Sequence, residues 1–144
     1  MTSRALVPDL TTGWDDSPVV LVSNRSNGAV TLTIMFASSP GDASTPVRRS
    51  RAVFRGVYLY RFVDIDLGYE PDNSDDYEFT LIDVTDSSLR EDVYTRGRWQ
   101  NEGLERDLRV VLAPDRLRHY RIGFDDHGTY DVLCTDVTVE HDVE

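Results

Sequence analysis

Apolar and polar residues alternate at every second position in several short stretches of this chain. In the clearest stretch, residues 30–36, apolar side chains at the even positions alternate with Thr31, Thr33 and Met35. Because successive side chains of a strand point to opposite faces, this period predicts strands that bury one face. The apolar run 19–22 precedes it, and Ser26-Asn27-Gly28 has turn chemistry, so residues 18–37 are predicted to form a β-hairpin.

Further strands follow at similar spacing. The run 53–67 is apolar at both parities, which predicts a central strand or one that covers two cores, and Gly56 marks a bulge within it. A second bulge is predicted near Thr135, because the apolar residues change parity along 129–140. The remaining predicted strands are built on three sets of alternating residues: Tyr77, Phe79 and Leu81; Leu108, Val110 and Leu112; and Tyr120, Ile122 and Phe124.

Helical patterning is confined to one short segment. Ser88 and Glu91 have the spacing of a capping box, which predicts a helix over 89–94 that ends before Gly97. Six or seven short strands with little helix and no internal repeat predict an all-β fold, an antiparallel β-sandwich, with a barrel as the alternative. At 144 residues a single domain is expected over 18–144, preceded by an extended N-terminal arm, 1–17.

A short motif near the C-terminus gives this sandwich a more specific form. Asp126, Gly128 and Tyr130 stand in the order Asp-x-Gly-x-Tyr, which resembles the tyrosine corner of immunoglobulin-like sandwiches. The resemblance implies a structural role for these three residues, in which the tyrosine hydroxyl bonds to backbone across a loop. Val132 stands where that family has a cysteine, and fourteen residues follow Tyr130, so a jelly-roll-like topology is the alternative.

The charged residues are an unusual selection. All fifteen basic residues are arginine, and nineteen of the twenty-six acidic residues are aspartate, which gives a formal net charge of -11. Such a surface stays hydrated where salt screens its self-repulsion, and the composition resembles that of proteins from salt-loving archaea and their viruses. Negative charge of this size disfavours binding to nucleic acid and to anionic lipid.

The sequence also indicates where the protein is expected to be located. No apolar stretch has the length that crosses a bilayer, and residues 1–10 have neither a basic n-region nor an apolar h-region. The expected location is therefore the cytoplasm or a virion.

The single cysteine, Cys134, cannot form an intramolecular disulfide and is expected to be a small buried side chain.

No recognisable catalytic motif is present. A serine or cysteine nucleophile needs a base nearby, and the three histidines, His119, His127 and His141, lie outside any recognised motif. All three are expected at the surface. Paired aspartates such as Asp64 and Asp66 arise by chance in a chain with nineteen aspartates. The protein is therefore predicted not to be an enzyme.

The acidic loop 70–76 is rich in ligands for a hard cation. Asp72, Asp75 and Asp76 could hold calcium or magnesium through their oxygens, although the loop lacks the spacing of an EF-hand. A solvated acidic loop without an ion is the alternative. No other cofactor is predicted.

Charge is segregated along the chain. The stretch 47–63 holds five arginines and no acid, whereas 64–92 holds eleven acids and one arginine, and 125–144 holds seven acids and no arginine. A basic stretch of this kind fits contact with the acidic loops of a neighbouring copy, with nucleic-acid binding and an ordinary surface as alternatives. The predicted subunit-contact residues are Arg48, Arg49, Arg51 and Arg55.

These features together predict a non-enzymatic structural subunit that acts through protein contacts in a larger particle, a capsid or tail component of a halophile's virus. Its partners would be other protein subunits, in a homo-oligomer or particle. The alternative is a ligand-binding sandwich for carbohydrate or a cell-surface partner, with Tyr69, Tyr94 and Trp99 as stacking platforms. A third hypothesis is an unrecognised hydrolase that uses aspartates and a divalent ion.

Overall fold

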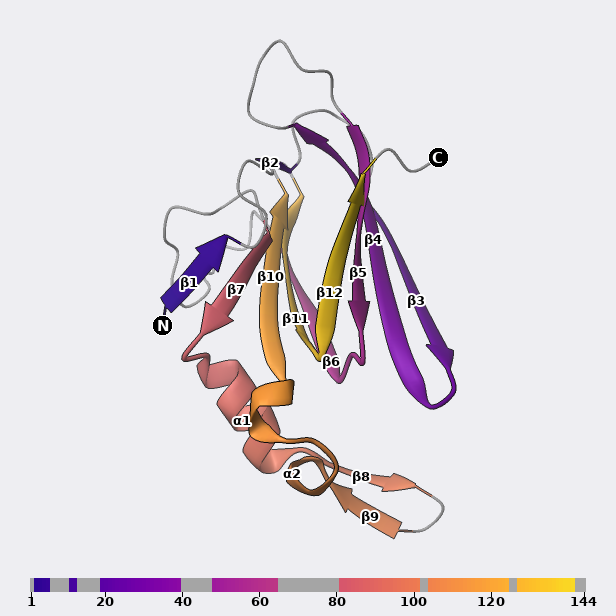
Figure 1. The fold of residues 1–144 in the computed structure, drawn as a ribbon, viewed down its shortest axis with the longest axis vertical. Helices are drawn as coiled ribbons and strands as arrows, with labels where there is room; N and C mark the ends of the chain where they lie inside the picture. The colour runs from indigo at the N-terminus through magenta and orange to yellow at the C-terminus, as the bar shows by residue number, and fades with distance from the viewer. Residues whose placement is uncertain are drawn as a thin grey trace.

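The computed structural model describes residues 2–5, 11–12, 19–39, 48–64, 81–101, 104–124 and 127–141. These residues form two antiparallel sheets packed as a β-sandwich, with a small helical extension at one end (Figure 1). No helix within these ranges is long and apolar enough to cross a membrane. The all-β sandwich predicted from the alternating pattern is therefore confirmed.

Each sheet combines strands from distant parts of the chain. The first sheet has the order β1 (Thr2–Ala5), β7 (Leu81–Thr85), β10 (Arg118–Phe124), β11 (Gly128–Cys134) and β6 (Leu59–Asp64). The second sheet has the order β12 (Asp136–His141), β5 (Arg48–Arg55) and β4 (Ala29–Ser39), and β3 (Val20–Ser26) and β2 (Thr11–Thr12) both pair with β4. Two parts of the predicted arm, β1 and β2, thus add strands to the sandwich.

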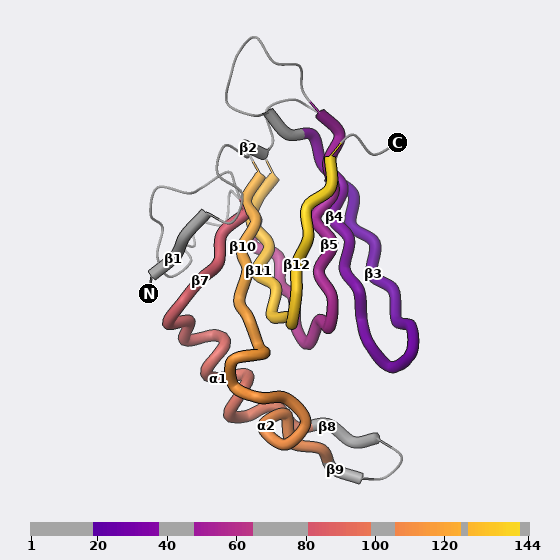
Figure 2. Tube along the Cα trace, viewed as in Figure 1, coloured from indigo at the N-terminus to yellow at the C-terminus, as the bar shows by residue number. Residues whose placement is uncertain are grey.

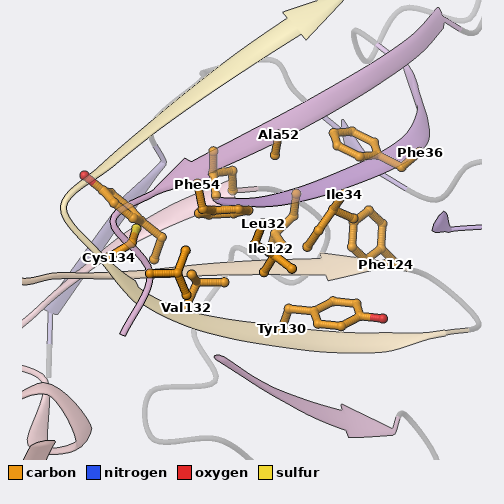
Figure 3. Close-up of a cluster of buried hydrophobic side chains, with 13 residues drawn as sticks. Leu32, Ile34, Phe36, Ala52, Phe54, Ile122, Phe124, Tyr130, Val132 and Cys134 are labelled. Carbon is orange, nitrogen blue, oxygen red and sulfur yellow. The ribbon is translucent and has the colours of Figure 1, made fainter. Parts of the chain in front are cut away.

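The core lies between the two sheets. Even-numbered positions of β4, β5, β10 and β11 point into this space and form one buried cluster (Figure 3): Leu32, Ile34, Phe36, Ala52, Phe54, Tyr120, Ile122, Phe124, Tyr130, Val132 and Cys134. Phe36 and Phe124 meet edge to face, with ring centroids 5.2 Å apart. Cys134 is buried as predicted, and burial raises the pKa of its thiol to about 12.

Two neighbouring stretches carry the chain from one sheet to the other. β5 continues into β6 through residues 56–58, and β11 continues into β12 through Thr135. The two crossings bond to each other, since Thr135 N donates to Arg55 O at 3.0 Å and Tyr58 N donates to Leu133 O at 2.9 Å. One long two-stranded ribbon therefore belongs to both sheets.

A one-residue bulge lies where this ribbon changes sheet. Three residues, 56–58, stand opposite two, 134–135, and Gly56 has a φ of 62° there. The bulge predicted at Gly56 is confirmed. The second bulge predicted near Thr135 is wrong, because the apolar residues change parity there where the chain passes from one sheet to the other and the extra residue lies on the opposite strand. Leu59 packs against a second buried cluster outside the sandwich, so the run 53–67 contacts two cores, as predicted.

The helical extension builds that second cluster. It contains α1 (Ser88–Arg96), the hairpin of β8 (Arg98–Asn101) and β9 (Leu104–Asp107), α2 (Leu108–Val111) and a 3-10 turn, Pro114–Arg116. Its buried side chains pack against the outer face of the first sheet at Leu133. The members of the cluster are Tyr94, Leu108, Leu117 and Leu133.

Two local predictions are wrong in this extension. The cap of α1 is Ser87 and not Ser88, because Ser87 Oγ accepts a hydrogen bond from Arg90 N at 3.0 Å. The strand predicted around Val110 is helix α2, because Asp107 Oδ1 accepts from Arg109 N at 2.9 Å and caps a helical turn there.

The bulge can be tested with Gly56→Ala. The new methyl group would collide with the Thr135 hydroxyl and would also hold alanine at a positive φ. We expect a loss of about 2–4 kcal/mol in the free energy of unfolding, measured in urea. Gly28→Ala is the matched control: Gly28 also has a positive φ, 78°, but no atom lies within 4 Å of the added methyl group, so a loss of about 1 kcal/mol is expected. Equal losses would contradict the collision.

Candidate functional site

The histidines lie in three different environments. His141 Nδ1 is 2.8 Å from Ser50 Oγ, and the His127 ring is stacked on Tyr130. His119, on β10, points away from the core, as its parity predicts, yet it is only 1% exposed. The predicted surface position of His119 is therefore wrong, because this residue belongs to a buried polar network on the outer face of the first sheet.

Asp131 is the centre of this network. The register places Arg121, Asp131 and Arg61 in one row across β10, β11 and β6. Arg121 Nε donates to Asp131 Oδ1 at 2.8 Å, and Arg61 Nε donates to Oδ2 at 3.1 Å. His119 Nε2 lies 2.7 Å from Oδ1. Because Asp131 is 0% exposed, these three donors replace the water that a carboxylate otherwise binds.

The same contacts keep Asp131 ionised. Burial alone would raise the pKa of this carboxyl, but the hydrogen bond from His119 and the positive charge of Arg121 outweigh burial and lower the pKa to about 2. A carboxylate only accepts hydrogen bonds, so His119 Nε2 carries the proton between the two groups. The other ring nitrogen, Nδ1, faces Ser87.

The network ends at the start of α1. Ser87 Oγ lies 2.5 Å from His119 Nδ1, and in a neutral ring Nδ1 accepts the hydroxyl proton. Ser87, His119 and Asp131 thus have the composition of a nucleophilic triad. However, Ser87 is buried, and its oxygen already accepts from Arg90 N as the helix cap. In these contacts the serine anchors α1 to the first sheet.

Two of the arginines predicted for subunit contact are paired within the chain. β5 lies beside the acidic strand β12, where Arg51 pairs with Glu140, and Arg55 Nη1 lies 3.4 Å from Asp136 Oδ2. The segregation of charge along the sequence is therefore partly neutralised between neighbouring strands.

Arg48 and Arg49 differ from these two. Both are exposed at the start of β5, and neither forms an ion pair with another described residue. Among the four predicted contact arginines, these two are therefore the ones that no described acidic residue neutralises.

The predicted tyrosine corner lies at the β10–β11 turn. Asp126 is outside the described residues, and Gly128 has a φ of 145°. The hydroxyl of Tyr130 is 3.1 Å from Nε2 of His127, a side chain, whereas the resemblance implies a bond to backbone. The position of Tyr130 is also fixed by packing, because its ring lies 4.9 Å from that of Phe62.

The predicted metal ligands Asp72, Asp75 and Asp76 lie outside the described residues. Within the described ranges, no group of three or more His, Cys, Asp or Glu side chains is placed to hold a metal ion. The calcium site therefore stays a prediction.

Of the three predicted stacking platforms, the structure describes the side chain of Tyr94 only. Tyr94 is buried, and its hydroxyl donates to Leu112 O at 2.9 Å, so its predicted exposure is wrong. Tyr69 and the side chain of Trp99 lie outside the part of the chain that the structure describes.

An exposed aromatic row instead follows the bulge. Tyr58, Tyr60 and Phe62 are each exposed by 41–43%. Tyr58 also lines a cavity of about 610 Å³ between the β3–β4 turn, the bulge and α1. The charged residues that line this cavity are Arg25 and Arg98, so it is cationic in a strongly acidic chain.

The sequence contains a partial signal for the Asp131 network. His119, Arg121 and Asp131 all fall on the parity opposite to the core, and a turn at 125–127 pairs Arg121 with Asp131. The same parity fits a solvated face equally well. Ser87 lies 32 residues before His119, so no local pattern connects the two.

Asp131→Asn is expected to destabilise the protein strongly. The amide keeps the shape of the side chain but removes the buried negative charge that Arg121, Arg61 and His119 contact, a loss of about 3–5 kcal/mol in the free energy of unfolding. The control is Asp136→Asn, which removes an exposed partner of Arg55 and is expected to cost less than about 1 kcal/mol. Urea unfolding at pH 7 measures both, and similar costs would refute the central role of Asp131.

The pH dependence of stability provides a second readout for this variant. The folded pKa of Asp131, about 2, lies below the ordinary value of 3.8. Its contribution to stability is therefore fully present above the ordinary value and is lost as the pH falls from about 4 towards 2. This part of the acid sensitivity, on the order of 2 kcal/mol, should be missing in Asp131→Asn.

Comparison with known proteins finds no relative of this chain. No protein-family model, no curated protein and no solved structure matches the chain. The roles of these residues therefore follow from their own contacts, burial and charge.

Proposed function

We propose that this protein is a non-enzymatic structural subunit that acts through contacts with other protein subunits in a larger particle. The observation that carries the proposal is the outer face of the second sheet, which is turned away from the core. This face is continuous over β3, β4, β5 and β12 and combines exposed apolar side chains with arginines. Such a combination is typical of protein interfaces.

The register gives the composition of this face. One row across the four strands contains Val20, Met35, Arg51 and Glu140, and the next contains Val22, Thr33, Val53 and Thr138. Val20 and Val22 are 41% and 49% exposed. The apolar atoms therefore gather toward β3, and the charged pairs lie toward β12.

The charge of this face also supports contact between copies. The whole chain has a net charge of -11, yet the described residues on the outer face of the second sheet include three arginines against two acids: Arg49, Arg51 and Arg55, with Asp136 and Glu140. A neighbouring copy offers acidic surface elsewhere, such as the exposed Glu91 and Asp92 of α1. Complementary charge of this kind orients and speeds association.

The nature of the particle is the finer part of the proposal. A lysine-free, aspartate-rich chain fits a capsid or tail component of a halophile's virus, because multimolar salt screens the repulsion between acidic copies. An immunoglobulin-like or jelly-roll-like topology is part of the same finer proposal and rests on the sequence motif of Gly128 and Tyr130 alone, because the Tyr130 hydroxyl contacts the His127 side chain.

Light scattering from low to multimolar salt tests the assembly role. We expect defined oligomers that become more populated as salt screens the net charge. At intermediate salt, Arg49→Glu is expected to weaken association about tenfold, because Arg49 is exposed at this face. Arg106→Glu, at an exposed position on β9, makes the same charge reversal outside both surfaces and serves as the control. A monodisperse monomer under all salt conditions would contradict the proposal.

Ligand binding is a second candidate function, supported by the exposed row of Tyr58, Tyr60 and Phe62 beside the 610 Å³ cavity. Aromatic faces suit sugar rings, and the cavity has the size of a small-molecule site. For any glycan that the wild-type protein binds on an array, Tyr58→Ala is expected to weaken binding about tenfold. Val110→Ala, at an exposed apolar position on α2, is the control. An array without hits would remove this candidate.

A further inference from the structure

β3 lies at the edge of the second sheet, as far as the described strands show. It pairs with β4 over Val20–Ser26 in an unbroken register, and no described strand pairs with its other edge. In Figure 2, β3 runs along one flank of the molecule with β4 as its neighbour. All of its residues except Leu21 are exposed, so the backbone groups on the outer edge are accessible.

The outer edge of β3 lacks the features that normally block pairing with another chain. Edge strands are usually protected by charged side chains, proline or bulges. β12 carries Asp136 and Glu140, and β6 carries Arg61 and Asp64. Residues 20–24 of β3, Val-Leu-Val-Ser-Asn, carry no charge, no proline and no bulge. A flat, uncharged and partly apolar edge of this length is a template for a further strand.

Alternate backbone groups of β3 point to this edge. The two-residue turn at 27–28 has positive φ at both positions, so Ser26 and Ala29 form a hydrogen-bonded pair. Bonded and non-bonded positions alternate along an antiparallel ladder, so the even-numbered residues of β3 bond to β4. The odd-numbered residues therefore direct N–H and C=O groups outward: Leu21, Ser23 and Arg25.

We propose that β3 pairs antiparallel with β3 of a second copy, which joins the second sheets of the two copies into one sheet across a two-fold axis. Strand addition needs a partner with an open edge, and a second copy supplies one. With the axis at Val22, the exposed valines of the two strands lie on the same face, next to the axis.

Charge favours a second copy at this edge. Most surfaces of a chain with a net charge of -11 repel the same surfaces of its copy, whereas residues 20–24 are uncharged. Arg25 lies away from its counterpart in the antiparallel arrangement, so no like charges oppose each other. The inference rests on the proposed assembly function and adds a contact that does not involve Arg48 or Arg49.

Amide hydrogen exchange tests the pairing at single residues. In the monomer at low salt, the Val22 and Asn24 amides are protected by β4, while the Leu21 and Ser23 amides exchange freely. Exchange is carried out on the associated form in multimolar salt, and the labelled protein is diluted into low salt and read by NMR. We expect exchange at Leu21 and Ser23 to slow at least about tenfold on association. Unchanged exchange at these two residues in the associated form would overturn the pairing.

Two variants test the same edge by light scattering. Ser23→Pro removes an N–H that points outward and so leaves the bonds to β4 in place, and Val22→Lys puts a charge on the edge. Each is expected to weaken association at least about tenfold, with an unchanged far-ultraviolet circular dichroism spectrum. If Ser23→Pro does not fold, Val22→Lys decides. Val110→Lys, at an 82% exposed position on α2, is the control and should associate as the wild type does.

The outcomes separate the two proposals. If the wild-type protein associates and both edge variants associate equally well, the pairing of β3 is wrong and the assembly function stands. If the wild-type protein is a monomer at every salt concentration, both proposals are wrong.

Discussion

The hydrogen-bonded crossing between the two sheets is the constraint on which the rest of the structure depends. Because β5–β6 and β11–β12 cross together, one ribbon sets the register of both sheets. In the first sheet this register places Asp131 beside Arg61, and in the second it places Asp136 and Glu140 beside arginines of β5. A slip of one residue would turn each of these side chains to the opposite face. The bulge at residues 56–58 therefore determines the core and the ion pairs together.

This register decides which charged side chains meet, and the resulting ion pairs differ in burial between the two sheets. The ion pairs of β12 with β5 are partly exposed, where such pairs add little to stability. The row through Asp131 is buried, so the loss of one partner leaves charges that water cannot reach. The basic and acidic stretches that are separate in the sequence thus lie on neighbouring strands in the fold and pair there. The positive charge that these pairs leave over lies at the start of β5.

Local patterns predicted those parts of the fold that depend on local contacts. The β3–β4 hairpin and the bulge at Gly56 followed from alternation, turn chemistry and one change of parity. The strand predicted at Leu108 was a helix, because a cap at Asp107 outweighed the alternation, and the helix buries Leu108 while it leaves Val110 exposed. The network of Ser87, His119 and Asp131 joins three separate elements, so no periodicity within any one of them could reveal it.

The two proposed contacts respond to salt for different physical reasons. An isologous pairing of β3 closes after two copies, so a larger particle needs a second contact of another kind, which the arginines at the start of β5 supply. Charge attraction at that face weakens as salt rises, whereas backbone bonds and valine contacts at the β3 edge do not depend on charge. Salt also relieves the repulsion between two chains of net charge -11. Concentrated salt therefore favours the β3 edge, and the extent of assembly depends on how much of the face contact survives there.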